Sequence, residues 1–410
     1  MNSRNTRKIV VAFLGYLLAP LLVAAQTPDK ITAFPTDSLV LVRTKTALNY
    51  LNYGLGEDRL GGAKMGYLDS LVLLRITGQY KDLLRVRLTE NLTAWIQQNQ
   101  VRPDTNTRPP VQHLTGAWRV RGDDKFDYVS ISLPERLPYQ LRQEIKPSRV
   151  VVEIFGATAN TNWITQMQSA KAVEHLDYEQ VADEHLRVTI YLKEIQHWGN
   201  SAYYEGKRLV IKIKQQPPQL RLKNLTIAID AGHGGSNLGA RGLRSKQTEK
   251  DLNLLIAKHL RLYLEKKGAT VVMTRSNDTL LGNNDRLLKL RTTPPDLLVS
   301  IHLNAANDSI KTRGTSTYYK HLGFRPLSQA VLKRLLDLGL EEYGNIGRFN
   351  FTLNAPSDYP NVLVEGLFLS HPDDEALILE AAYRQKMARQ IGKGIRDWLK
   401  QVRKSVKVKE

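Results

Sequence analysis

The sequence predicts a multidomain protein in which two all-β domains precede an α/β domain with a mostly parallel sheet flanked by helices. The chain has 410 residues, which is too long for one hydrophobic core, since a domain usually has about 100–200 residues. Up to residue 216, apolar and polar residues alternate in short runs, as in strands with one buried face. From residue 225, strand-like runs alternate with long segments of helical period, which is typical of α/β domains.

The first β domain is predicted at residues 36–103, where short apolar runs are separated by glycines. We expect a small β-barrel here, and the region resembles the bacterial SH3-like domain. The resemblance rests on Leu41-Val42-Arg43, on Gly66 before a hairpin, on Arg85-Val86 and on Ala94-Trp95-Ile96. It implies a module that binds cell-wall peptides; a β-rich spacer is the alternative.

The second β domain is predicted at residues 113–216, after a polar linker at residues 104–112. Strict alternation at residues 129–133, 187–192 and 209–214 predicts half-buried strands, and the apolar run at 150–155 predicts a more buried one. Strands of this kind indicate a β-sandwich-type domain.

The α/β domain is predicted at residues 224–403. The segment 250–267 has apolar residues on one helical face and is followed by Gly268, a common helix stop. A second long amphipathic helix is predicted at 380–402. The predicted strands are at residues 225–229, 270–274, 297–301 and 362–364.

Residues 1–25 are predicted to be a secretory signal peptide. Arg4, Arg7 and Lys8 precede an apolar run, and small residues follow up to Ala25. A retained membrane anchor is the alternative, but the run is shorter than the ~20 residues that a spanning helix needs. We therefore expect an exported protein, periplasmic or associated with the cell wall, with no stable membrane insertion after cleavage.

The net charge and the absence of cysteine limit the binding partners and the metal ligands that can be expected. The net charge of +19 favours acidic partners such as nucleic acid, a membrane surface or an anionic envelope polymer. Export removes nucleic acid from the expected partners. The chain has no cysteine, so it has no disulfides, and a metal would have to be bound by His, Asp or Glu.

Four residues at predicted strand or helix ends carry the candidate chemistry. His233 lies in a glycine-rich turn after the first strand of the α/β domain, and His302 ends the strand at 297–301. Glu249 starts the long helix, where the helix dipole favours a carboxylate. Glu365 is the one charge in the apolar stretch 360–370, and burial is expected to perturb its pKa. Each residue also has a structural reading, as a buried hydrogen-bonded histidine, a first-turn acid or a salt-bridged carboxylate.

Together, the four residues predict metal-assisted hydrolysis of an amide. Two histidines and one carboxylate would bind Zn²⁺ and leave a fourth position open for water. A separate glutamate, Glu365, would accept a proton from water and pass it to the leaving amine.

Residues 224–403 resemble the N-acetylmuramoyl-L-alanine amidase family of zinc hydrolases. The resemblance implies that His233, Glu249 and His302 are the metal ligands and that Glu365 is the catalytic glutamate. It also implies peptidoglycan as the substrate, a role in cell separation or wall turnover, septal or activator proteins as candidate partners, and a wall-targeting role for the second β domain. The segments that carry it, in order, are 230–235, the helix at Glu249, Thr274-Arg275 with Asp278, 300–305, Gly314 with Tyr318-Tyr319, and 364–370.

The chain departs from the family pattern at Asn237, where Asp is common, and at Leu367 and His371, where Gly and Asn are common. These changes put the fit of the substrate in doubt. Family members that are held inactive carry a long insertion with a helix between the second histidine and the glutamate. Only 62 residues separate His302 from Glu365 here, so we expect no blocking helix and an open site.

Two other functions compete with this interpretation. The first is a non-catalytic wall-binding protein, which the intact set of four reactive residues disfavours. The second is a serine hydrolase with residues 233–236 as its oxyanion loop, but no Gly-x-Ser-x-Gly motif follows. A zinc protease of the His-Glu-x-x-His type is excluded because that motif is absent. Of the other histidines, only His321 is expected to be able to approach the site.

Overall fold

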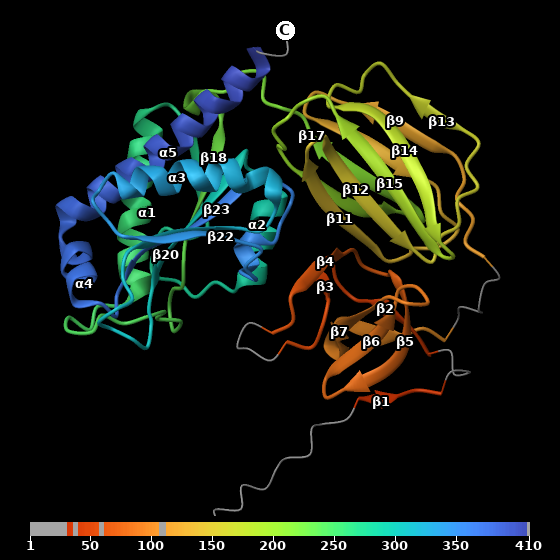
Figure 1. Cartoon of the computed structure of the whole chain (residues 1–410), viewed down its shortest axis with the longest axis horizontal. Helices are drawn as coiled ribbons and strands as arrows, with labels where there is room; N and C mark the ends of the chain where they lie inside the picture. Colours follow the sequence, from red (N-terminus) through yellow and green to blue (C-terminus); the bar gives the residue numbers. More distant parts are fainter. Residues whose placement is uncertain (1–30, 36–39, 57–60, 106–111, 408–410) are drawn as a thin grey trace, which may run out of the picture.

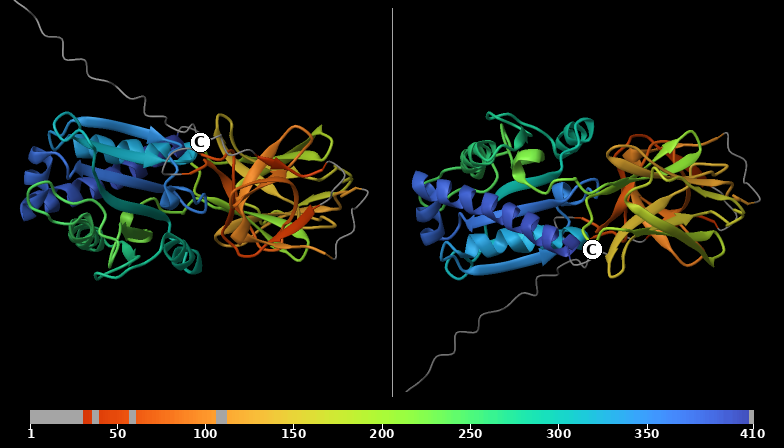
Figure 2. Two further views of the ribbon diagram at one scale, coloured as in Figure 1. Left: turned by 90° about the horizontal axis from the view of Figure 1, so that it is seen from below. Right: turned by 90° about the horizontal axis from the view of Figure 1, so that it is seen from above.

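The computed structural model describes residues 31–35, 40–56, 61–105 and 112–407. The predicted signal peptide and most of the predicted linker lie outside these ranges. Two all-β regions and a C-terminal α/β domain follow one another, which confirms the predicted order of fold types (Figure 1). In both views of Figure 2, the α/β domain lies beside the two β domains. Within the described ranges, every helix is too short or too polar to cross a bilayer.

The first domain is one sheet with the strand order β4-β3-β7-β6-β5-β2-β8 and with β1 on β5. On β5, Leu74 and Ile76 are buried while Arg75 between them is not, so the alternating sequence gives the strand one core face. Its relation to SH3-like domains remains a prediction. The elements are β1 (Thr32–Ala33), β2 (Val40–Thr44), β3 (Asn49–Asn52), β4 (Lys64–Leu68), β5 (Leu73–Tyr80), β6 (Leu83–Arg87), β7 (Thr93–Gln97), the 3-10 helix η1 (Gln98–Gln100) and β8 (Val101–Pro103).

The second domain has two sheets, with the orders β13-β9-β10-β17-β16 and β11-β12-β15-β14. Val129 and Ile211 of one sheet and Val150 and Val188 of the other belong to one buried cluster, so the sheets pack face to face. The elements are β9 (Trp118–Gly122), β10 (Phe126–Ile131), β11 (Tyr139–Ile145), β12 (Ser148–Phe155), β13 (Ile164–Gln166), β14 (Val173–Ala182), β15 (His185–Leu192), β16 (Asn200–Glu205) and β17 (Arg208–Lys214).

The α/β domain is built on a sheet with the order β19-β18-β20-β23-β21-β22. The pairings of β18, β19, β20 and β23 are parallel, and β21 runs antiparallel to β23. The elements are η2 (Leu222–Asn224), β18 (Thr226–Ala231), α1 (Glu249–Lys266), β19 (Thr270–Met273), α2 (Asn283–Thr292), β20 (Leu297–Asn304), β21 (Thr315–Tyr319), η3 (Leu322–Phe324), α3 (Arg325–Leu336), β22 (Glu342–Gly347), η4 (Thr352–Asn354), β23 (Asn361–Phe368), α4 (Pro372–Leu379) and α5 (Ala381–Lys407).

Helices cover both faces of this sheet. Ile227 and Ile229 of β18 belong to a buried cluster with residues of α1, α3 and α5. Ala228, between them, packs in another cluster with Leu287 and Leu290 of α2. Because neighbouring residues of a strand point to opposite faces, α2 covers the face opposite the other three helices. This double cover explains why β20 and β23 are nearly continuous apolar runs.

The sequence patterns do not predict α2 or β22. Most positions of α2 are polar, and only Arg286, Leu287 and Leu290 are buried. The edge strand β22 contains Gly344 and Gly347 and has no buried residue. The predicted helix at 380–402 corresponds to α5, which runs from Ala381 to Lys407 after the separate helix α4.

The three domains contact one another directly. The buried cluster of the second domain continues into the first domain through Leu74 and Val86. Trp198 of the second domain packs against Trp398 of α5, with 5.2 Å between the ring centres. Leu48 of the first domain belongs to a buried cluster with Leu287 and Leu290 of α2. The α/β domain therefore contacts both β domains.

Candidate metal centre

His233, Glu249 and His302 come together at the carboxyl ends of β18 and β20 and the start of α1. Their ligand atoms all lie within 4.8 Å of one another. Glu249 lies between the two rings, with Oε2 at 3.1 Å from Nε2 of His233 and Oε1 at 3.0 Å from Nδ1 of His302. Within the described ranges, these three residues are the only group of His, Asp or Glu side chains that could bind a metal in this way.

The turn after β18 places the His233 ring. His233 has φ of 62°, an uncommon value for a residue with a side chain. Its Nδ1 lies 2.9 Å from Oδ1 of Asn237. A proton on Nδ1 donates to Asn237, and a metal at the cluster would take the place of the Nε2 proton that hydrogen-bonds to Glu249. The side-chain amide of Asn237 therefore orients the ring.

Gly232 and Gly239 make room for the cluster. A Cβ atom at Gly232 would lie 2.2 Å from Cε1 of His302, and one at Gly239 would lie 2.4 Å from Oε2 of Glu249. A side chain at either position would displace a predicted ligand. The close packing of rings and carboxylate thus depends on these two glycines.

Glu249 is buried as a charged group with several donors. Oε2 accepts from the backbone N–H of Ala240, and Oε1 accepts from the N–H of Leu303 and from Nδ2 of Asn253. Burial alone would raise the pKa of Glu249, but hydrogen bonds to His233 and His302 hold it well below its usual range. Burial by itself lowers the pKa of His233, yet the hydrogen bond to Glu249 raises it above its ordinary value. The carboxylate is thus ready to serve as an anionic ligand.

A buried ion pair between Arg286 and Asp230 holds the turn that carries His233. Nη1 of Arg286 lies 2.6 Å from Oδ1 of Asp230, and both side chains are almost fully buried. Asp230 also accepts hydrogen bonds from Thr274 and Ser300. Nη2 of Arg286 donates to the carbonyl of His233 at 2.6 Å. The sequence patterns miss Arg286, because it lies in the polar helix that they do not predict.

Glu365 lies on β23, directly opposite His302 of β20 in the parallel register. Its side chain lines the same cleft as His233, Glu249 and His302, and it is 7% exposed. Ser316 of β21 is its partner on the other side. The tertiary fold therefore brings all four predicted site residues to one cleft.

The cleft has a volume of about 920 Å³ and one aromatic wall. Phe351 packs against His302 with nearly parallel rings, 6.5 Å apart and inclined by 9°. Phe349 and Phe351 are 4.5 Å apart, and each contacts the ring of Tyr318 on β21 at 5.1 Å. Phe349 and Phe351 lie in a loop with no periodic pattern, so the sequence patterns do not predict them as site residues.

The segment between His302 and Glu365 contains one α-helix, α3. This helix packs against α5 and against β21 and β23, as part of the helical layer of the sheet. It contributes no residue to the lining of the metal cleft.

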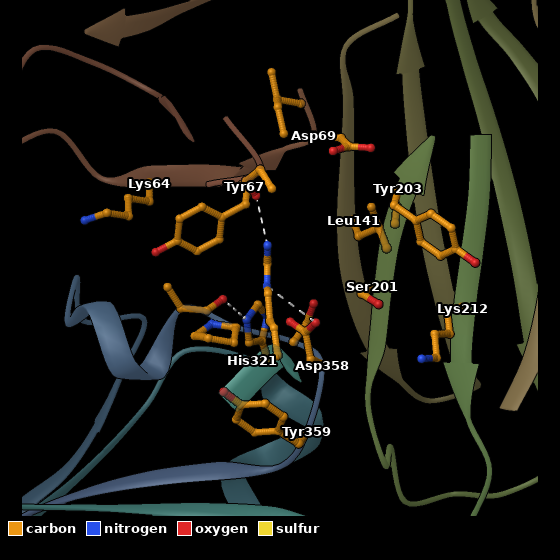
Figure 3. Close-up of a pocket in the computed structure, with 18 of the residues that line it drawn as sticks. Lys64, Tyr67, Asp69, Leu141, Ser201, Tyr203, Lys212, His321, Asp358 and Tyr359 are labelled. Atoms are coloured by element: carbon orange, nitrogen blue, oxygen red, sulfur yellow. Dashed lines mark hydrogen bonds and ion pairs between the residues drawn. The ribbon is translucent and has the colours of Figure 1, made fainter. Parts of the chain in front are cut away.

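A second cavity, of about 280 Å³, lies where the three domains meet (Figure 3). Lys64 and Tyr67 of the first domain line it together with Tyr203 of the second domain and His321 and Asp358 of the α/β domain. Nε2 of His321 lies 2.9 Å from the carbonyl oxygen of Ala355. His321 is thus part of the junction between the domains and does not line the metal cleft.

Residues 227–397 match the model of the family described as N-acetylmuramoyl-L-alanine amidase. A relative named probable cell wall amidase LytH, from Staphylococcus saprophyticus subsp. saprophyticus, is 34% identical over 189 residues. That alignment covers 46% of this chain and 63% of the relative. The chain therefore spans less than two thirds of that relative's length.

Two solved structures are similar in sequence to the C-terminal part of this chain. The catalytic domain of CwlV, an N-acetylmuramoyl-L-alanine amidase from Bacillus (Paenibacillus) polymyxa var. colistinus, is 31% identical, with 43% of this chain and 98% of that chain covered and a TM-score of 0.41. An N-acetylmuramoyl-L-alanine amidase from Clostridium difficile 630 is 35% identical, with 43% and 96% covered and a TM-score of 0.41.

Proposed function

Because residues 227–397 match the N-acetylmuramoyl-L-alanine amidase family, we propose that the α/β domain hydrolyses the amide bond between N-acetylmuramic acid and L-alanine in peptidoglycan. The observation that carries the proposal is the cluster of His233, Glu249 and His302, with Glu365 on the adjacent strand and in the same cleft.

Two imidazole nitrogens and one carboxylate oxygen fit a zinc ion. This donor set, with one position left for water, is typical of catalytic zinc sites. The anionic state of Glu249 and the room that Gly232 and Gly239 leave around it support the fit. When bound, zinc would supply a Lewis acid that polarises the scissile carbonyl and acidifies water.

The protein's own groups would handle the proton. Glu365 would accept a proton from the attacking water as the oxygen bonds to the carbonyl carbon. The same carboxyl would then donate that proton to the leaving nitrogen as the C–N bond breaks. The aromatic wall of Phe349 and Phe351 would hold the parts of the substrate that do not react.

We also propose a location and a role for the whole chain. The protein would be exported and would act in the periplasm or on the cell wall, in cell separation or wall turnover. The two β domains would bind the wall. The net charge of the whole chain is +19, and removal of residues 1–25 with Arg4, Arg7 and Lys8 would leave +16, which would favour an anionic envelope. Since α3 belongs to the helical layer and does not line the cleft, the site would be open without an activator protein.

The test is to incubate the purified protein with peptidoglycan, with and without a chelator, and to identify the products by mass. We expect free stem peptides that begin with L-alanine, and we expect chelation and Glu365→Gln each to abolish them. No release from any sample, with the protein still sedimenting with the wall, would instead support a wall-binding protein. Release only after a partner protein is added would contradict the open site.

A further inference from the structure

The first β domain touches the loop that carries the aromatic wall of the metal cleft. Asn350 lies between Phe349 and Phe351 in the sequence. Its side-chain amide makes two hydrogen bonds to the first domain. Its Nδ2 donates to the carbonyl of Gly62 at 3.0 Å, and its Oδ1 accepts from the N–H of Lys64 at 3.2 Å. The side chain of Asn350 thus ties the loop that carries Phe349 and Phe351 to the backbone of the first domain.

A third hydrogen bond fastens the neighbouring strand to the same backbone. Nζ of Lys320 donates to the carbonyl of Lys64 at 3.0 Å. Lys320 directly follows β21, whose Tyr318 contacts both phenylalanines. Both elements that build the aromatic wall are therefore held by residues 62–64 of the first domain.

The first-domain side of this contact is itself firmly held. The N–H of Tyr53 donates to the carbonyl of Ala63 at 2.9 Å, which extends the pairing of β3 with β4. A Cβ at Gly62 would lie 2.1 Å from the carbonyl oxygen of Gly54, so this backbone is packed too tightly for a side chain. Residues 62–64 thus present their carbonyl and N–H groups from a fixed position.

On the cleft side, ring contacts hold the two phenylalanines, but the loop has no helix or strand of its own to define its backbone. Phe349, Asn350 and Phe351 belong to no helix or strand and are each only partly buried. Arg348, just before them, has φ of 59°, where a residue with a side chain is strained. A loop of this kind needs contacts from outside to keep one conformation.

We propose that Asn350 is a positioning residue through which the first β domain sets the aromatic wall of the metal cleft and thereby the affinity for substrate. The inference rests on the proposed amidase function for the nature of the substrate, peptidoglycan. Since Phe351 packs beside a predicted metal ligand but is not itself a ligand or an acid–base group, the contact acts on binding of the substrate and not on the reacting bond.

The test compares two isosteric changes in the full-length protein. Asn350→Asp removes the donor to Gly62 and places a carboxylate against a carbonyl oxygen. Gln196→Glu is the matched control, because the amide of Gln196 also bridges two domains. Its Nε2 donates to the carbonyl of Gly323 and its Oε1 accepts from Nε1 of Trp398, and Nε2 also donates to the carbonyl of His197 within its own domain. That bridge lies away from the metal cleft, and Gln196 does not line it.

We expect Asn350→Asp to raise KM for soluble peptidoglycan fragments about five- to tenfold, since a neutral hydrogen bond contributes ~1 kcal/mol and 1.4 kcal/mol is tenfold. kcat and the affinity for zinc should stay within twofold, and Gln196→Glu should leave all three unchanged. In a Phe351→Leu background, Asn350→Asp should have no further effect on KM, because coupled residues are not additive. Equal effects of both amide changes, or an undiminished effect in the Phe351→Leu background, would overturn the proposal.

A second readout does not depend on activity. A fluorinated phenylalanine placed at position 351 should give one sharp ¹⁹F resonance in the otherwise unchanged protein and in Gln196→Glu. It should give shifted or multiple resonances in Asn350→Asp. If the protein proves inactive on peptidoglycan but the ¹⁹F spectra differ in this way, the proposed function fails while the positioning by the first domain stands. Identical spectra in all three proteins would refute the positioning role.

Discussion

His302 and Glu365 lie opposite each other on the neighbouring parallel strands β20 and β23. The sequence separates them by 62 residues, but the strand register places them one interstrand spacing, about 4.8 Å, apart in the sheet. A predicted metal ligand and a predicted proton acceptor are therefore carried by two adjacent inner strands of the sheet.

We therefore expect that mutation can remove proton transfer by Glu365 without removing metal binding by His302. Glu365→Gln should lower kcat by about 10²–10⁴-fold, the usual contribution of a general acid–base group. Its zinc content should remain near one ion per chain, as measured by metal analysis after dialysis. His302→Ala should lose both activity and zinc. If Glu365→Gln lost its zinc as well, Glu365 would be a ligand and not the proton acceptor.

Zinc should also stabilise the folded protein. A ligand that binds only the native state adds about 2.7 kcal/mol at a free concentration 100 times its Kd. We expect chelation to lower Tm of the unmodified protein and of Glu365→Gln, and added zinc to restore it. His233→Ala, which lacks one predicted ligand, is the control and should show little response. An equal response in His233→Ala would contradict its role as a ligand.

Asn237 should tune the affinity for zinc through the His233 ring. Its Oδ1 lies 2.9 Å from Nδ1 of the ring, and loss of such a partner commonly lowers metal affinity 10–100-fold. Asn237→Ala should therefore weaken zinc binding in a competition with a chromophoric chelator, and Asn237→Asp should not. Unchanged affinity in Asn237→Ala would mean that the backbone of the turn alone orients the ring.

The ion pair of Asp230 and Arg286 should be a large contributor to stability. Asp230→Asn leaves the buried Arg286 without its carboxylate, a change that typically costs about 3–5 kcal/mol. Asp397→Asn breaks the more exposed pair with Arg334 and should cost less than ~1 kcal/mol. Urea unfolding of both variants measures the difference, and equal values would contradict the argument.

The same pair has a defined pH dependence. Burial would raise the pKa of Asp230, but Arg286 and the nearby hydrogen bonds lower it below the ordinary value. The stability it contributes is therefore fully present above the unfolded pKa of ~3.9 and is lost as pH falls through the lower folded pKa.

The junction between the domains should weaken in mild acid. Burial lowers the pKa of His197 to about 4 and that of His321 to about 4, and each ring has a backbone carbonyl as its partner. Between pH ~6.5 and 4 the unfolded chain binds these protons and the folded chain does not, so stability falls as pH falls through this window.

For His197, which is 2% exposed, the loss should approach ~3 kcal/mol. The measurement is the free energy of unfolding at pH 7 and pH 4.5. His197→Gln should reduce the pH dependence, whereas a change at His175, which is not at this junction, should not. An unaltered pH dependence in His197→Gln would contradict the buried neutral ring.

The sequence by itself determined the order of the fold types and predicted the four candidate site residues that the fold brings to one cleft. Both depend on local information: period-2 alternation in the β domains, the 3.6-residue period of α1, and chemistry-bearing residues at strand ends such as His302. Because the carboxyl ends of parallel strands lie along one edge of a sheet, such residues can be expected to meet before any coordinates are known.

The tertiary structure alone decided what surrounds and supports these four residues. Arg286 reaches Asp230 from a helix with almost no apolar pattern, and Asn350 lies in a loop with no pattern at all. Their roles come from contacts with residues 56 and 286–288 positions away. Contacts between residues so far apart in the sequence depend on how whole helices and strands pack, and local periodicity carries no information about that packing.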